Sequence, residues 1–213
     1  MANECWPLFD LAVETPRVTL RSLDDSLAQR VLAVAARGVH DPATTPFSVP
    51  WTDLPSPQME QEAMRFYWRT RAAVSPDSWT LQFAVLAEGD VIGACDLAAD
   101  GFAQLRQVTT GSWIGREFQG KGLGTALRRA ALGLAFEGLD ARFATTVAWH
   151  DNLPSLGVTR SLGYEHIGRR QALRRGQPDE QVELRMTRAH WMTIRDNHLT
   201  LHGLDEARSF LGL

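Results

Sequence analysis

A glycine-rich stretch near the middle of the 213-residue chain has the residue types of an anion-binding turn. Residues 119–124 read Gln-Gly-Lys-Gly-Leu-Gly and follow an apolar run that ends at Ile114. From Leu123 onward, apolar residues recur at intervals of three and four, which indicates one face of a helix. Glycines let a ligand approach the backbone, and the first N–H groups of a helix have no partner within it. The stretch therefore predicts a phosphate-binding turn between a strand and a helix.

Two nucleotide-binding patterns fail at this turn. A P-loop needs Ser or Thr after its Gly-Lys pair to bind magnesium, but Gly122 follows Gly120 and Lys121. The dinucleotide pattern GxGxxG also fails, because Thr125 and Leu127 stand where its last glycine belongs. A nucleotide-binding domain is therefore a weak alternative. A second alternative is an ordinary strand-to-helix turn that binds no ligand. It is disfavoured because each glycine costs about 0.5–1 kcal/mol of chain entropy on folding.

A third pattern, Q/R-x-x-G-x-G/A, is filled by Gln119, Gly122 and Gly124. Downstream, Asn152 and Ser155 stand at the spacing N-x-x-S, a few residues after an apolar run. Together these motifs resemble the pyrophosphate loop and the following short helix of the GNAT superfamily, the coenzyme A-dependent N-acyltransferases.

Three further phrases resemble one branch of that superfamily, the ribosomal-protein N-terminal acetyltransferases. Residues 15–21 read Thr-Pro-Arg-Val-Thr-Leu-Arg, and residues 111–114 read Gly-Ser-Trp-Ile. The loop from His40 to Thr52, rich in proline, is similar to that of an actinobacterial subgroup, at least one member of which is associated with succinyl rather than acetyl transfer. The resemblance covers about residues 15–187 and is most specific over residues 108–164.

The resemblance implies an α+β fold, in which a mixed central sheet of about seven strands is flanked by helices and splayed at the coenzyme A site. Alternating apolar patterns predict the strands, and helical periodicity predicts helices from Asp24 or Asp25 to Ala36 and from Gln58 to Ala73. We expect one domain over residues 1–213, with an N-terminal arm and a C-terminal helix and tail added to the core. The expected strands cover residues 17–23, 79–86, 91–97, 108–114, 142–149, 164–170 and 181–186.

The resemblance also assigns a binding site for acetyl-coenzyme A or succinyl-coenzyme A. The strand end would pair with the pantetheine arm, the glycine loop would hold the pyrophosphate, and the short helix would contact the pantetheine and the sulfur. The residues in these roles are Trp113, Ile114, Gly115, Gln119, Gly120, Lys121, Gly122, Leu123, Gly124, Thr125, Asn152 and Ser155.

The catalytic groups are less defined. Ser155 is expected to protonate the departing thiolate, because Thr159 replaces the tyrosine common in the superfamily. His150, beside Asp151, is the leading candidate for the general base, while Asp41 and Glu183 are weaker ones. The positions at which many relatives carry a carboxylate are threonines, Thr109 and Thr110. Without a strong base, the enzyme would suit an α-amine, of which about one molecule in six is neutral at pH 7.

Acceptor binding is expected from the long loop between the first two strands, through His40, Phe47 and Trp51. If the donor is succinyl-coenzyme A, His40 or Arg17 would hold its terminal carboxylate. The arginines at residues 174 and 175 are expected in a solvated hairpin tip. The competing function is a non-catalytic acyl-coenzyme A-binding module of the same fold.

The composition of the chain limits which classes of partner it can bind. A net charge of −3 gives no electrostatic footprint for nucleic acid, and no apolar run approaches the ~20 residues of a membrane span. The N-terminus lacks the regions of a signal peptide, so we expect a cytoplasmic protein. Two cysteines without metal-ligand spacing predict no metal. The expected partners are acyl-coenzyme A, an amine acceptor (a small molecule or a protein N-terminus) and a second copy of the chain in a homodimer.

Overall fold

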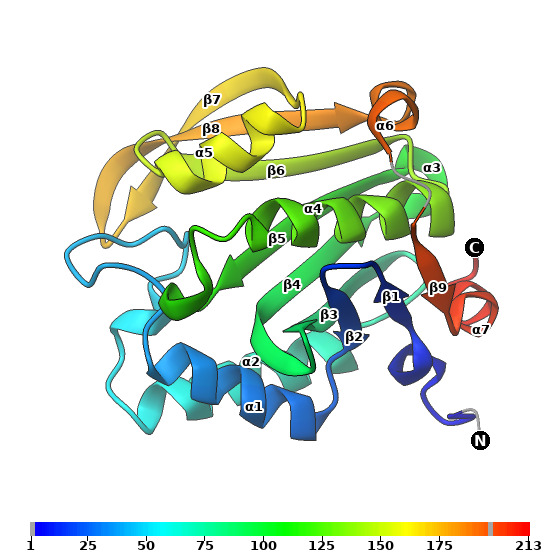
Figure 1. Cartoon of the computed structure of the whole chain (residues 1–213), viewed down its shortest axis with the longest axis horizontal. Coiled ribbons are helices and arrows are strands. Elements are labelled where there is room, and N and C mark those ends of the chain that lie inside the picture. The colour runs from blue at the N-terminus through cyan, green and yellow to red at the C-terminus, as the bar shows by residue number, and fades with distance from the viewer. Residues whose placement is uncertain (1–2, 196–197) are drawn as a thin grey trace.

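The computed structural model describes residues 3–195 and 198–213 and is built on a single nine-stranded sheet (Figure 1). The strand order is β7-β8-β6-β5-β4-β3-β2-β1-β9. All neighbouring strands are antiparallel except β5 and β6, which are parallel. The strands are β1 Ala12–Glu14, β2 Thr19–Ser22, β3 Ser78–Ala87, β4 Asp90–Asp100, β5 Gln107–Ile114, β6 Phe143–Trp149, β7 Glu165–Arg174, β8 Gln177–Thr187 and β9 Thr200–His202.

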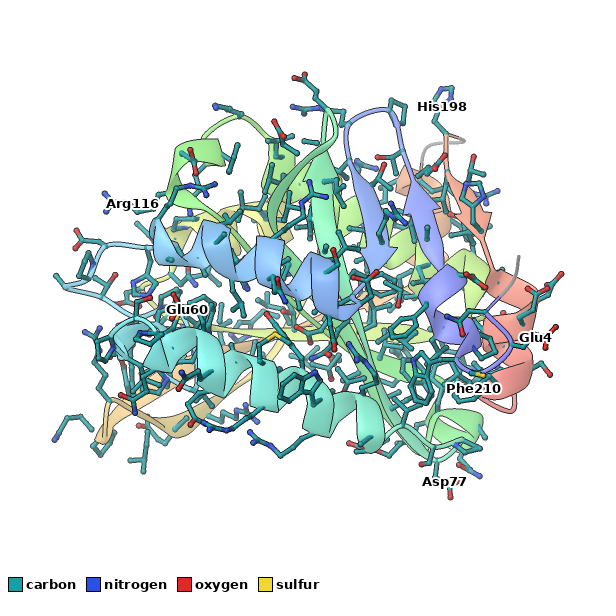
Figure 2. The ribbon with its side chains drawn as sticks, turned by 90° about the horizontal axis from the view of Figure 1, so that it is seen from below. Glu4, Glu60, Asp77, Arg116, His198 and Phe210 are labelled. Atoms are coloured by element: carbon teal, nitrogen blue, oxygen red, sulfur yellow. The ribbon has the colours of Figure 1, made fainter. Side chains whose placement is uncertain are left out.

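Helices cover both faces of the sheet. Figure 1 shows α4 and α5 on one face of the sheet. Figure 2, seen from below, shows α1 and α2 next to each other on the other face. The α-helices are α1 Asp25–Ala36, α2 Gln58–Ala72, α3 Phe102–Leu105, α4 Leu123–Gly133, α5 Leu153–Ser161, α6 Arg188–Ile194 and α7 Leu204–Phe210. The expected α+β architecture is therefore confirmed.

Local sequence explains where the helices begin. Asp24 caps α1, since its Oδ1 accepts a hydrogen bond of 2.7 Å from the Leu27 N–H. Asn152 caps α5 in the same way, accepting from the Ser155 N–H at 3.2 Å. The short apolar stripe of α1 then packs, through Val31 and its neighbours, against α2, β3 and β4.

The seven expected strands correspond to β2 through β8, and two short strands at the outer edge were missed. β1 and β9 have three residues each and pair with one another, which extends the sheet beyond β2. Three residues are too few to show an alternation of apolar and polar side chains, so the sequence pattern did not predict these strands. The residues of β1 were expected to belong to an irregular arm, and those of β9 to a C-terminal tail.

The sheet opens between β5 and β6. Their ladder contains only the pairs Gln107↔Phe143, Val108↔Ala144 and Thr109↔Thr145. Beyond Thr109 the two strands continue without further pairs, although both run on for several residues. The predicted splay is therefore present, and it begins five residues before the end of β5.

The C-terminal segment packs on the same domain. The Trp191 ring is buried against Phe136, and its Nε1 donates to Glu137 Oε1 at 3.1 Å. Phe210 lies edge-on to Trp6 with ring centroids 5.1 Å apart. The apolar residues that suggested a dimer contact are thus used within one chain, and the homodimer stays a prediction. No helix among residues 3–195 and 198–213 is long and apolar enough to cross a membrane.

Candidate active site

The glycine loop presents a run of unused backbone donors. Gly120 and Gly122 both have φ of +74°, in the left-handed region that favours glycine, and Gly122 is the N-cap of α4. Ala126 is the first residue of α4 whose N–H finds a backbone acceptor, the Gly122 carbonyl. Within the described residues, the N–H groups of residues 120–125 have no hydrogen-bond acceptor. Six adjacent donors at a helix N-terminus form a site suited to a phosphate group.

Arg17 adds a cation to this loop. Its Nη2 donates to the Lys121 carbonyl at 2.7 Å, and its Nη1 lies 3.1 Å from the place that a Cβ on Gly122 would occupy. The guanidinium therefore lies over the glycine at which α4 begins. Sequence reasoning considered Arg17 only as a partner for a succinyl carboxylate. The structure instead puts it at the expected pyrophosphate end of the site.

Gln119 fixes the shape of the loop with its side chain. Its amide nitrogen donates to the carbonyls of Val39 and Ile114, each at 2.8 Å. This side chain is therefore a tether between the loop, the end of β5 and the segment after α1. Lys121 is also turned back, because its Nζ donates to the Glu117 carbonyl at 3.0 Å.

The edge of β5 at the splay exposes alternate backbone groups. The Gly115 N–H is used, since it donates to the Ile92 carbonyl on the β4 side at 2.9 Å. Because backbone groups alternate along a strand, the N–H of Trp113 also faces β4, whereas those of Ser112 and Ile114 face the splay. Of the three residues expected to pair with the pantetheine arm, only Ile114 thus turns its backbone N–H toward the splay. The Ser112 N–H also faces the splay, and sequence reasoning did not assign it to the site.

A threonine cluster marks the point where the strands separate. Thr110 Oγ1 donates to the Thr145 carbonyl at 3.2 Å, and Thr146 Oγ1 donates to the Thr110 carbonyl at 2.9 Å. Arg128, buried on α4, donates to Thr110 Oγ1 at 2.5 Å and to Ser112 Oγ at 3.3 Å. These side-chain bonds replace the missing ladder at the base of the splay. The hydroxyl of Thr110 is therefore used in hydrogen bonds within the fold. This position, where many relatives carry a carboxylate, has a structural role here.

Helix α5 packs beside the start of α4. A Cβ on Gly124 would lie 3.6 Å from the side chain of Val158, in the second half of α5. Ser155 is in the first turn of α5 and partly buried. Thr159, at the usual tyrosine position, is buried, and its Oγ1 donates to the Ser155 carbonyl at 3.3 Å and the Leu156 carbonyl at 3.1 Å. Thr159 is thus occupied inside its own helix.

The long loop carries a chain of aromatic contacts to β5. His40 lies edge-on to Phe47, Phe47 packs on Trp51, and Trp51 packs on Trp113, with centroids 5.3 to 5.8 Å apart. Both ring nitrogens of His40 are engaged inside the loop, Nδ1 with the Asp41 carbonyl at 2.8 Å and Nε2 with Thr52 Oγ1 at 2.7 Å. The three residues expected to bind the acceptor therefore come together, with His40 fixing the loop.

The hairpin tip is exposed at residues 175–178, as expected, and its two arginines also bind this loop. Arg175 binds both carboxylate oxygens of Asp53, at 2.7 and 2.8 Å, and its guanidinium also reaches the carbonyls of Pro42 and Thr44. Arg174 is largely buried and donates to the Thr45 carbonyl at 2.9 Å. No local pattern indicated these contacts, because the partners of the two arginines are distant in sequence.

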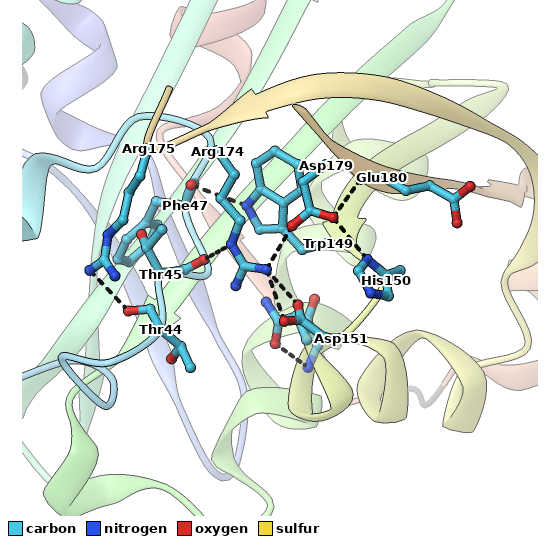
Figure 3. A network of polar contacts seen from close by, with 12 residues as sticks. Thr44, Thr45, Phe47, Trp149, His150, Asp151, Arg174, Arg175, Asp179 and Glu180 are labelled. Carbon is cyan, nitrogen blue, oxygen red and sulfur yellow. Dashed lines mark hydrogen bonds and ion pairs between the residues drawn. The ribbon is translucent and has the colours of Figure 1, made fainter. Parts of the chain in front are cut away.

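Figure 3 shows that His150 belongs to the same network. Its Nδ1 lies 3.2 Å from Asp179 Oδ1, whereas Asp151 is bound by Arg174. Hydrogen bonding from the Glu180 N–H and from Arg174 lowers the pKa of Asp179. His150 is half exposed and paired with a residue of β8, not with its neighbour Asp151. His150 is thus part of the polar network around Asp179 and Arg174.

Sequence reasoning overlooked Asp96, a carboxylate on β4, the strand that pairs with β5 on the side away from the splay. It stands in the middle of β4, in register with Gly111 of β5. Burial raises the pKa of this carboxyl to about 6, with the positive charge of Arg128 opposing the shift. The signal available in the sequence was a charged residue within the otherwise apolar strand pattern of residues 91–97. Within the described parts of the chain, no group of three or more His, Cys, Asp or Glu residues is placed to hold a metal ion.

Comparison with known proteins adds the following. A family model described as acetyltransferase (GNAT) domain matches residues 17–165. RimJ from Mycobacterium smegmatis, solved in complex with CoA-disulfide, is 16% identical with a TM-score of 0.65, and the match covers 88% of this chain and 95% of that one. A structure described as a ribosomal-protein-serine acetyltransferase from Vibrio cholerae is 18% identical with a TM-score of 0.63, covering 83% and 97%. An acetyltransferase structure from T. thermophilus is 18% identical with a TM-score of 0.67, covering 85% and 92%.

Proposed function

The chain belongs to the acetyltransferase (GNAT) family, and we propose that it moves an acetyl group from acetyl-coenzyme A to a primary amine by direct attack. The observation that carries this proposal is the run of unpaired N–H groups at residues 120–125 beneath the Arg17 guanidinium. Those donors and that cation match two adjoining phosphates better than they match any group in the chain itself.

The splay supplies the second half of the donor site. The Ser112 and Ile114 N–H groups line it on β5, and α5, which begins after the neighbouring strand β6, packs beside α4. We assign the pantetheine arm to these groups, with one N–H polarising the thioester oxygen as negative charge develops on it. The amide nitrogen of Asn152, which its capping role leaves free, is assigned to the pantetheine as well.

Ser155 is the group proposed to protonate the departing thiolate. Its N–H is fixed by Asn152, which holds the first turn of α5, while its hydroxyl has no acceptor among the described residues. Thr159 cannot take this role because its hydroxyl is buried and bonded to the carbonyls of its own helix.

An α-amine is the proposed acceptor, in particular the N-terminus of a protein. A Lys ε-amine is only about one part in two thousand neutral at pH 7, whereas an α-amine is neutral in about one molecule in six. The Vibrio cholerae neighbour is named for a ribosomal-protein acceptor, which supports the same class. The aromatic loop of His40, Phe47 and Trp51 is proposed to cover the acceptor.

Acetyl is favoured over succinyl as the transferred group. A succinyl carboxylate at the acyl end would need a free cation, but both His40 nitrogens are engaged within the loop. Arg17, the other candidate, is bound at the glycine loop.

Calorimetry and a thiol-release assay test these proposals together. The protein is titrated with acetyl-coenzyme A, succinyl-coenzyme A and ATP, and thiol release is then followed over a panel of peptides with free and blocked N-termini. We expect binding of the coenzyme but not of ATP, and turnover that requires a free N-terminus. Coenzyme binding without thiol release from any amine would instead favour the non-catalytic module.

A further inference from the structure

Asp96 occupies a cross-strand row of side chains at the centre of the sheet. On one side it is in register with Gln82 of β3, and on the other with Gly111 of β5. Arg128 of α4 bonds Thr110 and Ser112, so these residues face α4. Because side chains alternate along a strand, Gly111 and its partner Asp96 face the opposite side, toward Trp113 and the aromatic loop.

The space around the Asp96 carboxylate exists because residue 111 is glycine. A Cβ built on Gly111 would lie 2.6 Å from Oδ1 and 3.0 Å from Oδ2 of Asp96. The carboxylate therefore lies directly over the backbone of β5, one residue, or about 3.4 Å of strand rise, before the Ser112 N–H at the splay.

This carboxylate lacks the partners that a structural one would have. Across residues 3–195 and 198–213, no hydrogen-bond donor or cation is within bonding distance of its oxygens. The neighbouring Gln82 is equally unmatched, since its Nε2 is buried without an acceptor. Taken as a whole residue, Asp96 is partly buried, and its side chain lies on the face of the sheet that Trp113 also faces.

The charged and titratable groups around Asp96 come from three elements. Tyr67 of α2 is buried nearby, and its pKa is raised by burial and by the charge of Asp96. Arg128 of α4 acts from the other face of the sheet, and Cys95 is the adjacent residue of β4, its pKa also raised by burial and by Asp96. With a pKa of about 6, the carboxyl is ionised at neutral pH yet holds a proton far better than a solvated aspartate.

Coenzyme and acceptor must reach the splay from opposite sides. The glycine loop, α4 and α5 occupy the side that Thr110 and Ser112 face, so the coenzyme fills that side. The amine then approaches from the side of Trp51, Trp113 and Asp96. The carboxylate thus lies on the path of the amine, next to the backbone donors that would hold the thioester.

We propose that Asp96 is the general base that deprotonates the acceptor amine, an inference that rests on the proposed acetyltransferase function. The ammonium group gives one proton to the Asp96 carboxylate and becomes a neutral amine. Its nitrogen lone pair forms the C–N bond to the thioester carbon, and the C–S bond breaks as the electron pair leaves with sulfur. The nitrogen, positively charged once the C–N bond has formed, loses its second proton. The thiolate takes one proton from the Ser155 hydroxyl, which regains one from the nitrogen, and the proton held by Asp96 returns to water.

Steady-state kinetics of Asp96→Asn test this assignment. The peptide found to be the best acceptor in the panel is used with the wild type, with Asp96→Asn and with Asp90→Asn, an exposed carboxylate on the same strand. We expect kcat/KM to fall 10²- to 10⁴-fold at pH 7 in Asp96→Asn only, with an unchanged Kd for acetyl-coenzyme A. Circular dichroism and a melting curve check that each variant is folded.

The pH profile separates a base from a merely structural residue. The wild-type kcat/KM should bend near pH 6, and this bend should be absent from Asp96→Asn. The kcat/KM of the variant should also rise about tenfold per pH unit up to the pKa of the amine. Below that pKa, the fraction of acceptor that is already neutral in solution rises about tenfold per pH unit, and the variant depends on this fraction. Asp96→Glu should restore part of the activity.

Each outcome decides a different question. A folded Asp96→Asn with kcat/KM within threefold of the wild type and the same bend would overturn the assignment and leave the acetyltransferase function intact. A constant loss at every pH would assign Asp96 a structural role. Absence of wild-type thiol release over the whole panel would overturn the proposed function and this inference with it.

Discussion

Arg175 and Asp53 join the hairpin between β7 and β8 to the long loop after α1, through hydrogen bonds of 2.7 Å from Nε and 2.8 Å from Nη2. The two residues are 122 positions apart in the sequence. Because the loop also carries Phe47 and Trp51, this pair determines where the proposed acceptor cover lies over the sheet.

Removing the pair should loosen the loop without unfolding the domain. In Arg175→Ala we expect KM for the acceptor to rise several-fold while KM for acetyl-coenzyme A is unchanged, and proteolysis between residues 41 and 53 to become faster. The melting temperature should change little, because exposed ion pairs contribute little to stability. Arg169→Ala, which removes another exposed ion pair of the same hairpin, is the matched control.

The same pair has a defined pH dependence. The hydrogen bond from Arg175 lowers the pKa of Asp53 below its ordinary value of 3.8. A depressed carboxyl pKa contributes stability above the unfolded value, and this contribution is lost as the pH falls through the folded one. The proteolysis rate of the wild-type loop should therefore be constant from pH 8 to about pH 5. A rise near pH 6 would show that some other group fixes the loop.

Gly122 tests the glycine loop. Its φ of +74° makes a β-branched residue costly by about 1–2 kcal/mol, and a Cβ there would also meet Arg17. We expect Gly122→Val to raise Kd for coenzyme A more than tenfold and to lower the free energy of unfolding.

Gly89→Val is the control that separates these two effects. Gly89 also has positive φ, +89°, but it lies in the β3–β4 turn with nothing within 4 Å of its Cβ position. It should show a similar loss of stability and an unchanged Kd. Equal Kd values for the wild type and Gly122→Val would remove the loop from the binding site.

Much of the fold and about half of the site could be predicted from the sequence, for a physical reason. Motifs such as residues 119–124 and the Asn152 cap act through local backbone geometry, which neighbouring residues determine. The Arg17 contact with Lys121 and the Arg175 contact with Asp53 depend on how distant segments pack, and no local pattern encodes them. Asp96 was missed because its environment is made by Gly111, which only the strand register brings beside it.

Arg17 should matter only for the phosphate end of the donor. In Arg17→Ala we expect Kd for coenzyme A to rise about tenfold or more, since a charge-assisted hydrogen bond contributes about 1.5–3 kcal/mol. Binding of a pantetheine fragment without pyrophosphate should be unchanged, and the salt dependence of coenzyme A binding should weaken. Arg21→Ala, four residues further along the chain on β2, controls for net charge. A loss shared by the pantetheine fragment would argue for a general change in loop structure.

Ser155→Ala isolates the proposed proton donor. The substitution keeps the Ser155 N–H and hence the Asn152 cap, so α5 should be unaffected. We expect kcat to fall about 10- to 100-fold, less than the full contribution of a general acid because water can protonate the thiolate, with Kd for acetyl-coenzyme A unchanged. Ser161→Ala, near the C-terminal end of α5, should be silent. An unchanged kcat in Ser155→Ala would show that water, and not Ser155, protonates the departing thiolate.

The pH dependence of stability gives a test of Asp96 that needs no substrate. Burial raises the folded pKa of Asp96 to about 6, compared with 3.8 when solvated. A raised carboxyl pKa means that the folded state binds more protons than the unfolded one between these values, so stability falls as the pH rises from about 4 to about 6. Above pH 6 the full cost of the buried charge is present, and Asp96→Asn removes it. Since one pKa unit corresponds to about 1.4 kcal/mol, urea unfolding should give Asp96→Asn a gain at pH 8 that exceeds its gain at pH 4 by about 1–3 kcal/mol. Asp90→Asn should show no such difference, and an Asp96→Asn variant that is no more stable at pH 8 than the wild type would contradict the raised pKa.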